Sequence, residues 1–256
     1  MTKQWQQDQN FDQIADKFEK NIYGTSKGRL RHELLSHYLR HHLPERPLKC
    51  LDAGGGTGMM AKEMLDLGHS VLVNDISDQA LELARAKLAG FADVAFHCGP
   101  LQSLAADCEF DLILCHAVLE WLHDPFDALK HLFSRLKPGG YISLSFFNRD
   151  AHRFSNLLYG NFDYIDKDFV VSNRVRLNPN NALPPSQVLD FVEKAGLDIR
   201  HQAGIRCFHD YMRDKTMQSS HYEQIKAKEI QYGTVHPYLW LGRYFHIIAV
   251  KQDARL

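Results

Sequence analysis

The residues with the clearest chemical potential lie at 51–58, in the sequence LDAGGGTG. Glycine lets the main chain turn tightly and lets a ligand approach it with no Cβ in the way. Residues 48–52, of which three are apolar, predict a strand, and residues 59–67 predict a helix after the glycines. A glycine loop between a strand and a helix is typical of a site for a nucleotide-containing cofactor.

Asp75 adds an acidic side chain to this arrangement. It ends the next predicted strand, residues 70–75, and follows Gly56 by 19 residues. At that position a carboxylate can accept two hydrogen bonds from ribose hydroxyls, each contributing about 1.5–3 kcal/mol. Asp75 therefore indicates an adenosine-containing cofactor. It does not choose between NAD and S-adenosylmethionine, because residues 56–61 also fit the G-x-G-x-x-A dinucleotide pattern.

Three features favour S-adenosylmethionine. Asp52 ends the first strand directly before the glycines, where a carboxylate can anchor a cationic amino group but would repel a pyrophosphate. The sequences FDLILCHAVLEWL at 110–122 and LKPGGYISLSF at 136–146 resemble the fourth strand and the turn into the fifth strand of class I methyltransferases. A NAD-dependent dehydrogenase and a cofactor-binding protein without catalysis remain the alternatives from other classes.

Alternating strands and helices must position these residues. Strands are predicted at 48–52, 70–75, 94–98, 110–115 and 141–147, with helices at 59–67, 78–88 and from Asp124-Pro125 to residue 136. Two helices, 9–22 and one from Gly28 to Pro44, come before them. A helix after Pro184-Pro185, a strand at 199–208, a helix at 222–230 and a strand at 244–250 come after. Such alternation predicts βαβ units and a parallel sheet covered on both faces.

The class resemblance implies an α/β, Rossmann-like class I methyltransferase fold. Its sheet has seven strands and is mostly parallel with an antiparallel last strand, and an insert follows strand 5. We expect one domain over 1–256, with an N-terminal helical cap at 1–47, a cofactor-binding core at 48–148 and the rest of the sheet at 184–256. Residues 149–183 show little periodicity, which predicts an irregular insert on the substrate side.

Composition narrows the function classes. The 256 residues carry a net charge of −1, so a nucleic acid would have to bind a local basic patch. The five cysteines form no C-x-x-C pair and the 15 histidines no H-E-x-x-H motif, so we expect no metal site. No apolar run approaches the ~20 residues that span a bilayer, and the polar N-terminus lacks a signal-peptide core. We therefore expect a cytoplasmic protein with no membrane partner and no obligate protein partner.

Short motifs along nearly the whole chain point to one family. They are NFD at 10–12, NIYGT at 21–25, KG at 27–28, LR at 30–31, HAVLEW at 116–121, GNFDY at 160–164, FHDY at 208–211 and LGRY at 241–244. In this arrangement the sequence resembles the tRNA 5-carboxymethoxyuridine methyltransferases. The resemblance implies transfer of a methyl group from S-adenosylmethionine to the carboxylate of 5-carboxymethoxyuridine at the tRNA wobble position. The partner it implies is the anticodon region of tRNA.

The resemblance also implies a set of cofactor contacts. The family's contacts fall on Arg31, Gly54, Gly55, Asp75, His116 and the pair Pro100-Leu101. The pair departs from the small and polar residues typical of that position, so its register stays open by one residue.

We expect no catalytic residue beyond these contacts, because a carboxylate is already ionised at neutral pH and needs no general base. What remains is a cradle of cations and donors for the substrate. The run RCFHDYMR at 206–213 supplies arginines interleaved with aromatic residues, a composition suited to an unstacked base and its phosphates. We predict substrate contacts by Arg206, His209, Tyr211 and Arg213, with help from Tyr159, Asn161, Arg174 and Arg176. The alternative substrate is a small carboxylic acid or an acyl-carrier thioester.

Overall fold

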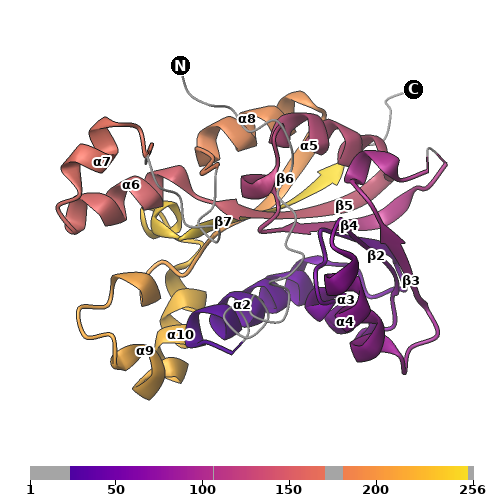
Figure 1. The fold of residues 1–256 in the computed structure, drawn as a ribbon, viewed down its shortest axis with the longest axis horizontal. Coiled ribbons are helices and arrows are strands. Elements are labelled where there is room, and N and C mark those ends of the chain that lie inside the picture. Colours follow the sequence, from indigo (N-terminus) through magenta and orange to yellow (C-terminus); the bar gives the residue numbers. More distant parts are fainter. Residues whose placement is uncertain (1–23, 106, 171–180, 253–256) are drawn as a thin grey trace.

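The computed structural model describes residues 24–105, 107–170 and 181–252, and its centre is a seven-stranded sheet (Figure 1). The strand order is β3-β2-β1-β4-β5-β7-β6. The strands are β1 (Lys49–Ala53), β2 (Ser70–Asp75), β3 (Val94–Cys98), β4 (Phe110–His116), β5 (Leu136–Phe147), β6 (Leu197–Ile205) and β7 (Tyr244–Lys251).

Strands β1 to β5 pair in parallel, whereas β7 runs antiparallel to both β5 and β6. Tyr244 at the start of β7 therefore lies opposite Phe147 on one side and Ile205 on the other. The carboxyl ends of β1, β2, β4, β5 and β6 meet the amino end of β7 along one edge of the sheet. This topology confirms the predicted Rossmann-like fold with its antiparallel last strand.

Helices cover both faces of the sheet, as predicted (Figure 1). The hydrophobic core accordingly has two clusters, one beneath each layer. Helices α5 (Pro125–Ser134) and α8 (Pro185–Lys194) pack on one face. The other face carries α2 (Ser26–His42), α3 (Met59–Asp66), α4 (Asp78–Leu88) and α10 (Tyr222–Tyr232).

Local sequence explains where several of these helices begin. The Asp124 side chain accepts from the backbone N–H groups of Phe126 and Asp127, and Pro125 occupies the first helical position of α5. Ser77 caps α4 in the same way through Ala80. The helix predicted from Gly28 begins two residues earlier, at Ser26, because Thr25 supplies the capping oxygen. The helix predicted at 9–22 lies outside the described residues.

Three sequence predictions need correction. The insert at 149–183 is not irregular throughout, since it contains α6 (Arg149–Leu158) and α7 (Phe162–Asp166). The apolar residues of α6 do recur at helical spacing, at Ala151, Phe154, Leu157 and Leu158, although only Ala151 of these is buried. The strand predicted at 199–208 ends at Ile205, and Leu136 begins β5 instead of ending α5. Short elements complete the description: η1 (Leu101–Ser103), η2 (Leu119–Trp121), η3 (His209–Tyr211), α9 (Met217–Ser220) and η4 (Tyr238–Leu241).

Within the described ranges, no helix combines the length and apolar character needed to cross a membrane. Over the same residues, no group of three or more histidine, cysteine, aspartate or glutamate side chains is arranged to hold a metal ion.

Candidate cofactor and substrate site

The glycine loop lies at the carboxyl edge of the sheet, between β1 and α3. Gly54 and Gly56 adopt φ values of 66° and 55°, in the left-handed region that favours glycine. A Cβ on Gly55 would lie 2.7 Å from Oδ2 of Asp52, and one on Gly54 would lie 2.5 Å from Cγ2 of Val118. The loop therefore has to be made of glycine, and its backbone stays open to close approach by a ligand.

Asp75 is fixed beside this loop by two backbone groups. Its Oδ2 accepts from the N–H of Gly56 at 2.9 Å, and its Oδ1 accepts from the N–H of Ser77 at 2.9 Å. Each carboxylate oxygen has a second lone-pair site. A positioned carboxylate of this kind fits a pair of ribose hydroxyls, and that role for Asp75 stays a prediction.

Asp52 is a buried carboxylate directly below the loop. Its Oδ2 accepts from the N–H of Ala61 at 3.1 Å. Burial raises the pKa of Asp52 to about 7, the nearby charge of Asp75 adds to the rise, and the bond from Ala61 opposes it. A buried acid with few partners favours a cation nearby, which suits the amino group of S-adenosylmethionine.

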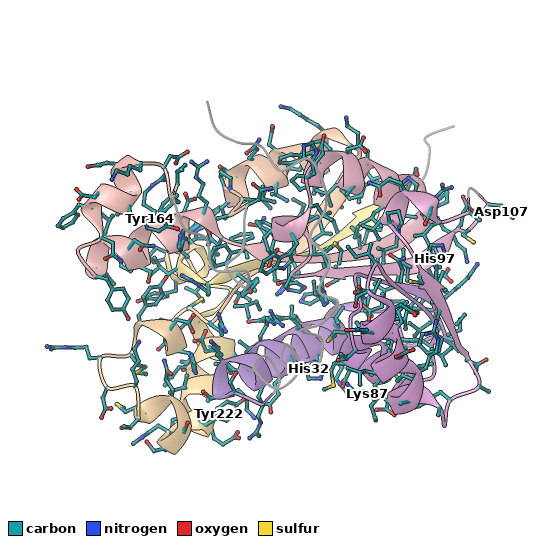
Figure 2. The ribbon with its side chains drawn as sticks, viewed as in Figure 1. His32, Lys87, His97, Asp107, Tyr164 and Tyr222 are labelled. Atoms are coloured by element: carbon teal, nitrogen blue, oxygen red, sulfur yellow. The ribbon has the colours of Figure 1, made fainter. Side chains whose placement is uncertain are left out.

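Side chains of β2 and α4 form hydrogen bonds that connect the segments along this edge of the sheet. Asn74 in β2 donates to the carbonyl of Gly99 at 2.9 Å and lies 2.9 Å from Nδ1 of His97. Lys87 of α4 donates to Oγ1 of Thr57 in the glycine loop at 3.2 Å. His97 and Lys87 mark the β3 and α4 sides of the site in Figure 2.

His116 ends β4 next to the glycine loop. Its Nε2 lies 2.8 Å from Oγ of Ser143, which lies 2.9 Å from Nε2 of His246. Burial lowers the pKa of His116 to about 3, and the charges of Arg31 and His32 lower it further, so the imidazole is neutral at pH 7. Its Nδ1 is buried with no hydrogen-bond partner among the described residues, which leaves it available to a ligand.

The strand is followed by two features that the sequence did not single out. Ala117 adopts a φ of 58°, a strained conformation for a residue with a side chain and one that occurs often at ligand sites. Glu120 is completely buried, and burial raises its pKa to about 7, while the charge of Arg31 opposes the rise. The HAVLEW motif contains both residues, but only the folded chain shows the strain and the burial.

Arg31 reaches the same edge from α2. Its guanidinium lies 5.2 Å from the ring centre of Tyr244, and its charge acts on both His116 and Glu120. Pro100 and Leu101 follow β3, where Gly99 donates to the carbonyl of Asp75 at 2.9 Å. Leu101 packs its side chain into the core and Pro100 is exposed, so a contact by Leu101 would use its backbone. The register of this pair stays a prediction.

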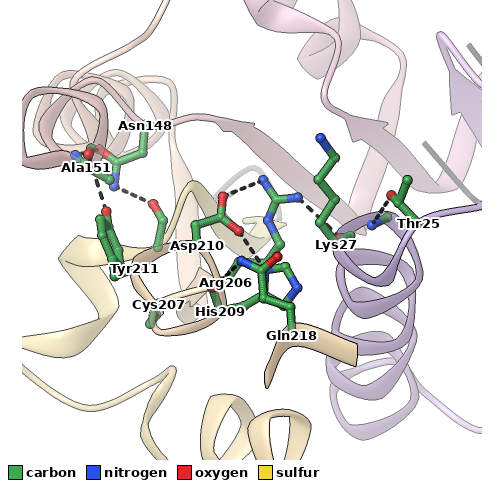
Figure 3. A network of polar contacts seen from close by, with 12 residues as sticks. Thr25, Lys27, Asn148, Ala151, Arg206, Cys207, His209, Asp210, Tyr211 and Gln218 are labelled. Carbon is green, nitrogen blue, oxygen red and sulfur yellow. Dashed lines mark hydrogen bonds and ion pairs between the residues drawn. The ribbon is translucent and has the colours of Figure 1, made fainter. Parts of the chain in front are cut away.

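The predicted substrate residues form a polar network instead of an open cradle (Figure 3). Arg206 is buried, with its Nη2 3.1 Å from Oδ2 of Asp210 and its Nη1 donating to the carbonyl of Lys27 at 3.3 Å. His209 is also buried. Its Nδ1 lies 2.8 Å from Oδ1 of Asp210, and its Nε2 lies 3.2 Å from Oγ of Ser26.

Tyr211 takes part in the same network. Its hydroxyl donates to the carbonyls of Leu241 at 2.9 Å and Ala151 at 3.3 Å, and burial raises its pKa. The structure thus brings Arg206, His209 and Tyr211 together at the carboxyl edge, where the protein engages both Nη atoms of Arg206, both ring nitrogens of His209 and the hydroxyl of Tyr211. The Nε of Arg206 is buried and has no hydrogen-bond partner among the described residues. Arg213 is exposed and stands apart from this network.

The residues predicted in the insert fall in two groups. Tyr159 is exposed, and Asn161 donates to Oδ1 of Asn156 at 2.9 Å. Arg174 and Arg176 lie outside the described residues. No assignment of substrate contacts within the insert follows from these positions.

Sequence comparisons match this chain to one family model and to relatives that are themselves methyltransferases. A family model described as a methyltransferase domain matches residues 51–144. The tRNA 5-carboxymethoxyuridine methyltransferase of Escherichia coli (strain K12) is 42% identical, over 97% of this chain and 98% of that protein. Ubiquinone biosynthesis O-methyltransferase from Leptothrix cholodnii is 28% identical over 62% of this chain and 67% of that protein.

Solved structures share the fold at low identity. A methyltransferase from Haloferax volcanii, in complex with its Trm112 activator, superposes with a TM-score of 0.63 at 15% identity and covers 96% of this chain and 98% of that one. The 1,6-didemethyltoxoflavin-N1-methyltransferase of Burkholderia thailandensis, with bound S-adenosylhomocysteine, gives 0.57 at 17% identity and covers 94% and 88%.

These matches decide between the classes that the sequence left open. They exclude the dehydrogenase and the non-catalytic cofactor-binding protein, and the glycine loop, Asp75 and the unpartnered Nδ1 of His116 fit the cofactor they imply. The chain is an S-adenosylmethionine-dependent methyltransferase and belongs to the tRNA 5-carboxymethoxyuridine methyltransferase family.

Proposed function

We propose that this enzyme methylates the carboxylate of 5-carboxymethoxyuridine at the wobble position of tRNA and releases the methyl ester. The relative that is 42% identical over nearly the full length carries this proposal. A feature of the site supports it: the guanidiniums of Arg31 and Arg206 lie 5.2 and 5.5 Å from the ring centre of Tyr244, and that of Arg243 lies 4.6 Å from the ring centre of Phe147. Positive charge beside the cofactor residues suits an anionic acceptor.

S-adenosylmethionine supplies a methyl group that its sulfonium sulfur already activates. The acceptor carboxylate oxygen forms the new bond to the methyl carbon while the carbon–sulfur bond breaks and the sulfur keeps the electron pair. No proton moves, because a carboxyl group with a pKa near ~4 is ionised at neutral pH. The enzyme therefore needs no general base, and we assign no catalytic residue.

The contribution of the chain is alignment. We assign Gly54, Gly55 and Asp75 to binding the adenosine part, Asp52 to the cationic amino group, and Arg31 to the methionine carboxylate. We assign His116, which is neutral and lies 2.8 Å from Oγ of Ser143, to the place where the cofactor and the acceptor meet. Holding the two reacting groups in line can lower the barrier by roughly 7–11 kcal/mol.

A tRNA partner has to be recognised without an overall positive charge, since the chain carries a net charge of −1. We propose that the anticodon region of tRNA binds at the carboxyl edge of the sheet, near residues 206–213 and the exposed side of α6. On the same ground we propose a cytoplasmic location for the enzyme.

The test is transfer of labelled methyl groups from S-adenosylmethionine to three acceptors. They are tRNA carrying 5-carboxymethoxyuridine, tRNA with an unmodified wobble uridine, and small carboxylic acids. We expect label only in the first tRNA, recovered as the methyl ester in a nucleoside digest analysed by mass spectrometry. Label in the small acids alone would support the alternative substrate, and label in the unmodified tRNA would exclude carboxyl methylation.

A further inference from the structure

Three guanidinium groups meet at the carboxyl edge of the sheet, around the paired residues Phe147 and Tyr244. Arg31 and Arg206 lie over the ring of Tyr244, and Arg243 lies 4.6 Å from the ring centre of Phe147. Burial lowers the pKa of Arg206, Asp210 and Tyr244 oppose that effect, and the charges of Arg31 and Arg243 lower it further. The three cations are therefore close enough to repel one another.

Two of these cations already have assignments. Arg206 is held by Asp210 and by the carbonyl of Lys27. Arg31 is our proposed contact to the methionine carboxylate of the cofactor. An anionic substrate therefore has to find its counter-charge elsewhere in the cluster.

Arg243 is the remaining member, and its side chain is only partly buried. Over residues 24–105, 107–170 and 181–252, no hydrogen bond or ion pair to its guanidinium is found. Its backbone, in contrast, is fixed on both sides: its N–H donates to the carbonyl of Arg206 at 3.3 Å, and its carbonyl accepts from the N–H of Asn148 at 3.2 Å. The ring of Phe147 supports one face of the guanidinium.

We propose that Arg243 binds the substrate carboxylate and thereby determines specificity for 5-carboxymethoxyuridine. This inference rests on the function proposed above and adds Arg243, which the sequence analysis did not include among the substrate contacts. A partly desolvated cation with no internal partner favours an incoming anion. A guanidinium offers two parallel N–H groups that match a carboxylate, which neither an ammonium nor a neutral donor reproduces. The methyl ester product is neutral, so methylation itself weakens the contact and favours release.

The experiment is a binding comparison with two proteins and two RNAs. Wild-type and Arg243→Ala proteins, each saturated with S-adenosylhomocysteine, are titrated with tRNA that carries 5-carboxymethoxyuridine or an unmodified wobble uridine. We expect the wild type to bind the carboxylate-bearing tRNA at least tenfold more tightly. The Arg243→Ala protein should bind both tRNAs with the same affinity. That affinity should equal the affinity of the wild type for the unmodified tRNA.

Matched variants keep this test decisive. Arg46→Ala removes a positive charge near Asp111, at the opposite edge of the sheet, and should preserve the wild-type preference. Arg243→Lys keeps the charge but loses the paired donors, so it should keep only part of the preference. Thermal unfolding and titration with S-adenosylhomocysteine report whether each variant is folded. If Arg243→Ala does not fold, Arg243→Gln replaces it in the same comparison.

The outcomes separate the inference from the function on which it rests. A preference that survives in Arg243→Ala overturns the inference, while wild-type methylation of the modified tRNA leaves the proposed function intact. Equal weakening for both tRNAs assigns Arg243 to a phosphate and also overturns it. A wild type with no preference and no methyl transfer contradicts the proposed function itself.

Discussion

The two halves of the site are built in different ways. In the cofactor half, the decisive bonds are local: Asp52 accepts from a residue nine positions away, and Asp75 accepts from one 19 positions away. In the substrate half, Arg206 contacts a carbonyl 179 positions away, and His209 contacts Ser26 across 183 positions. A local motif can be recognised in a sequence, whereas the substrate half exists only after three distant segments have assembled.

The two halves also differ in whether their charged side chains are paired within the protein. The cofactor half presents the carboxylate of Asp75 beside an open glycine backbone and keeps Asp52 buried with a raised pKa. The substrate half neutralises its central cation internally, because Arg206 pairs with Asp210. We therefore expect damage to the cofactor half to appear in binding, and damage to the Arg206 network to appear first in stability.

The largest effect should come from Arg206→Ala. Removing one member of a buried ion pair leaves the other uncompensated and costs about 3 kcal/mol, at the lower end of the usual range because the Asp210 side chain is 22% exposed. Urea denaturation measures the free energy of unfolding. Arg200→Ala is the control, since its pair with Asp198 is exposed and contributes at most about 1 kcal/mol.

A loss in Arg206→Ala no greater than in the control would show that the network is not a stabilising element. A folded Arg206→Ala protein with normal stability but no methyl transfer would return Arg206 to direct substrate binding.

The glycine loop should give the next largest effect. Gly54→Ala introduces a Cβ 2.5 Å from Val118 at a position with φ of 66°, and we expect binding of S-adenosylmethionine to weaken about a hundredfold, or ~2.7 kcal/mol. Gly68→Ala shares the left-handed backbone, with φ of 83°, but its Cβ meets nothing within 4 Å. Calorimetry should therefore show an unchanged affinity for Gly68→Ala, and equal losses in both variants would attribute the effect to backbone strain alone.

Asp75→Ala tests the polar part of the cofactor half. We expect affinity for S-adenosylmethionine to fall at least tenfold, since losing one charged acceptor costs ~1.4 kcal/mol or more. Asp75→Asn keeps the shape of the side chain and one acceptor oxygen, so its affinity for S-adenosylmethionine should lie between those of the wild type and Asp75→Ala. Unchanged affinity in Asp75→Ala would remove this residue from the site.

The smallest effect is a pH dependence from Asp52. A cationic amino group binds the ionised carboxylate, so affinity for S-adenosylmethionine should fall as pH drops through the raised pKa of about 7. For a single group of that pKa, the loss between pH 7 and pH 6 is about fivefold. The Asp52→Asn protein should show a flat profile over this range. The same decline in that variant would place the titrating group elsewhere.

The sequence predicts the cofactor half of the site better than the substrate half, because the first depends on local bonds and the second on contacts between distant segments. The glycine loop, the two aspartates and the alternation of strands and helices predict the cofactor half, because each depends on φ preferences, periodicity and spacing within short segments. The insert at 149–183 was predicted less well: the apolar residues of α6 recur at helical spacing, but the helix spans only Arg149–Leu158 and is followed by a polar stretch of sequence with little periodicity.

The sequence by itself predicted the fold class, favoured S-adenosylmethionine as the cofactor and indicated the strand ends where we place the ligands, because those features depend on local backbone geometry. Only the tertiary structure decided which of the arginines are already paired. Arg206 and Arg243 are both arginines in the sequence, yet among the described residues Asp210 forms an ion pair with the first and acts on the second only through its charge, without an ion pair. Electrostatic pairing depends on distance in space, and the antiparallel return of β7 sets that distance by placing Tyr244 between Phe147 and Ile205.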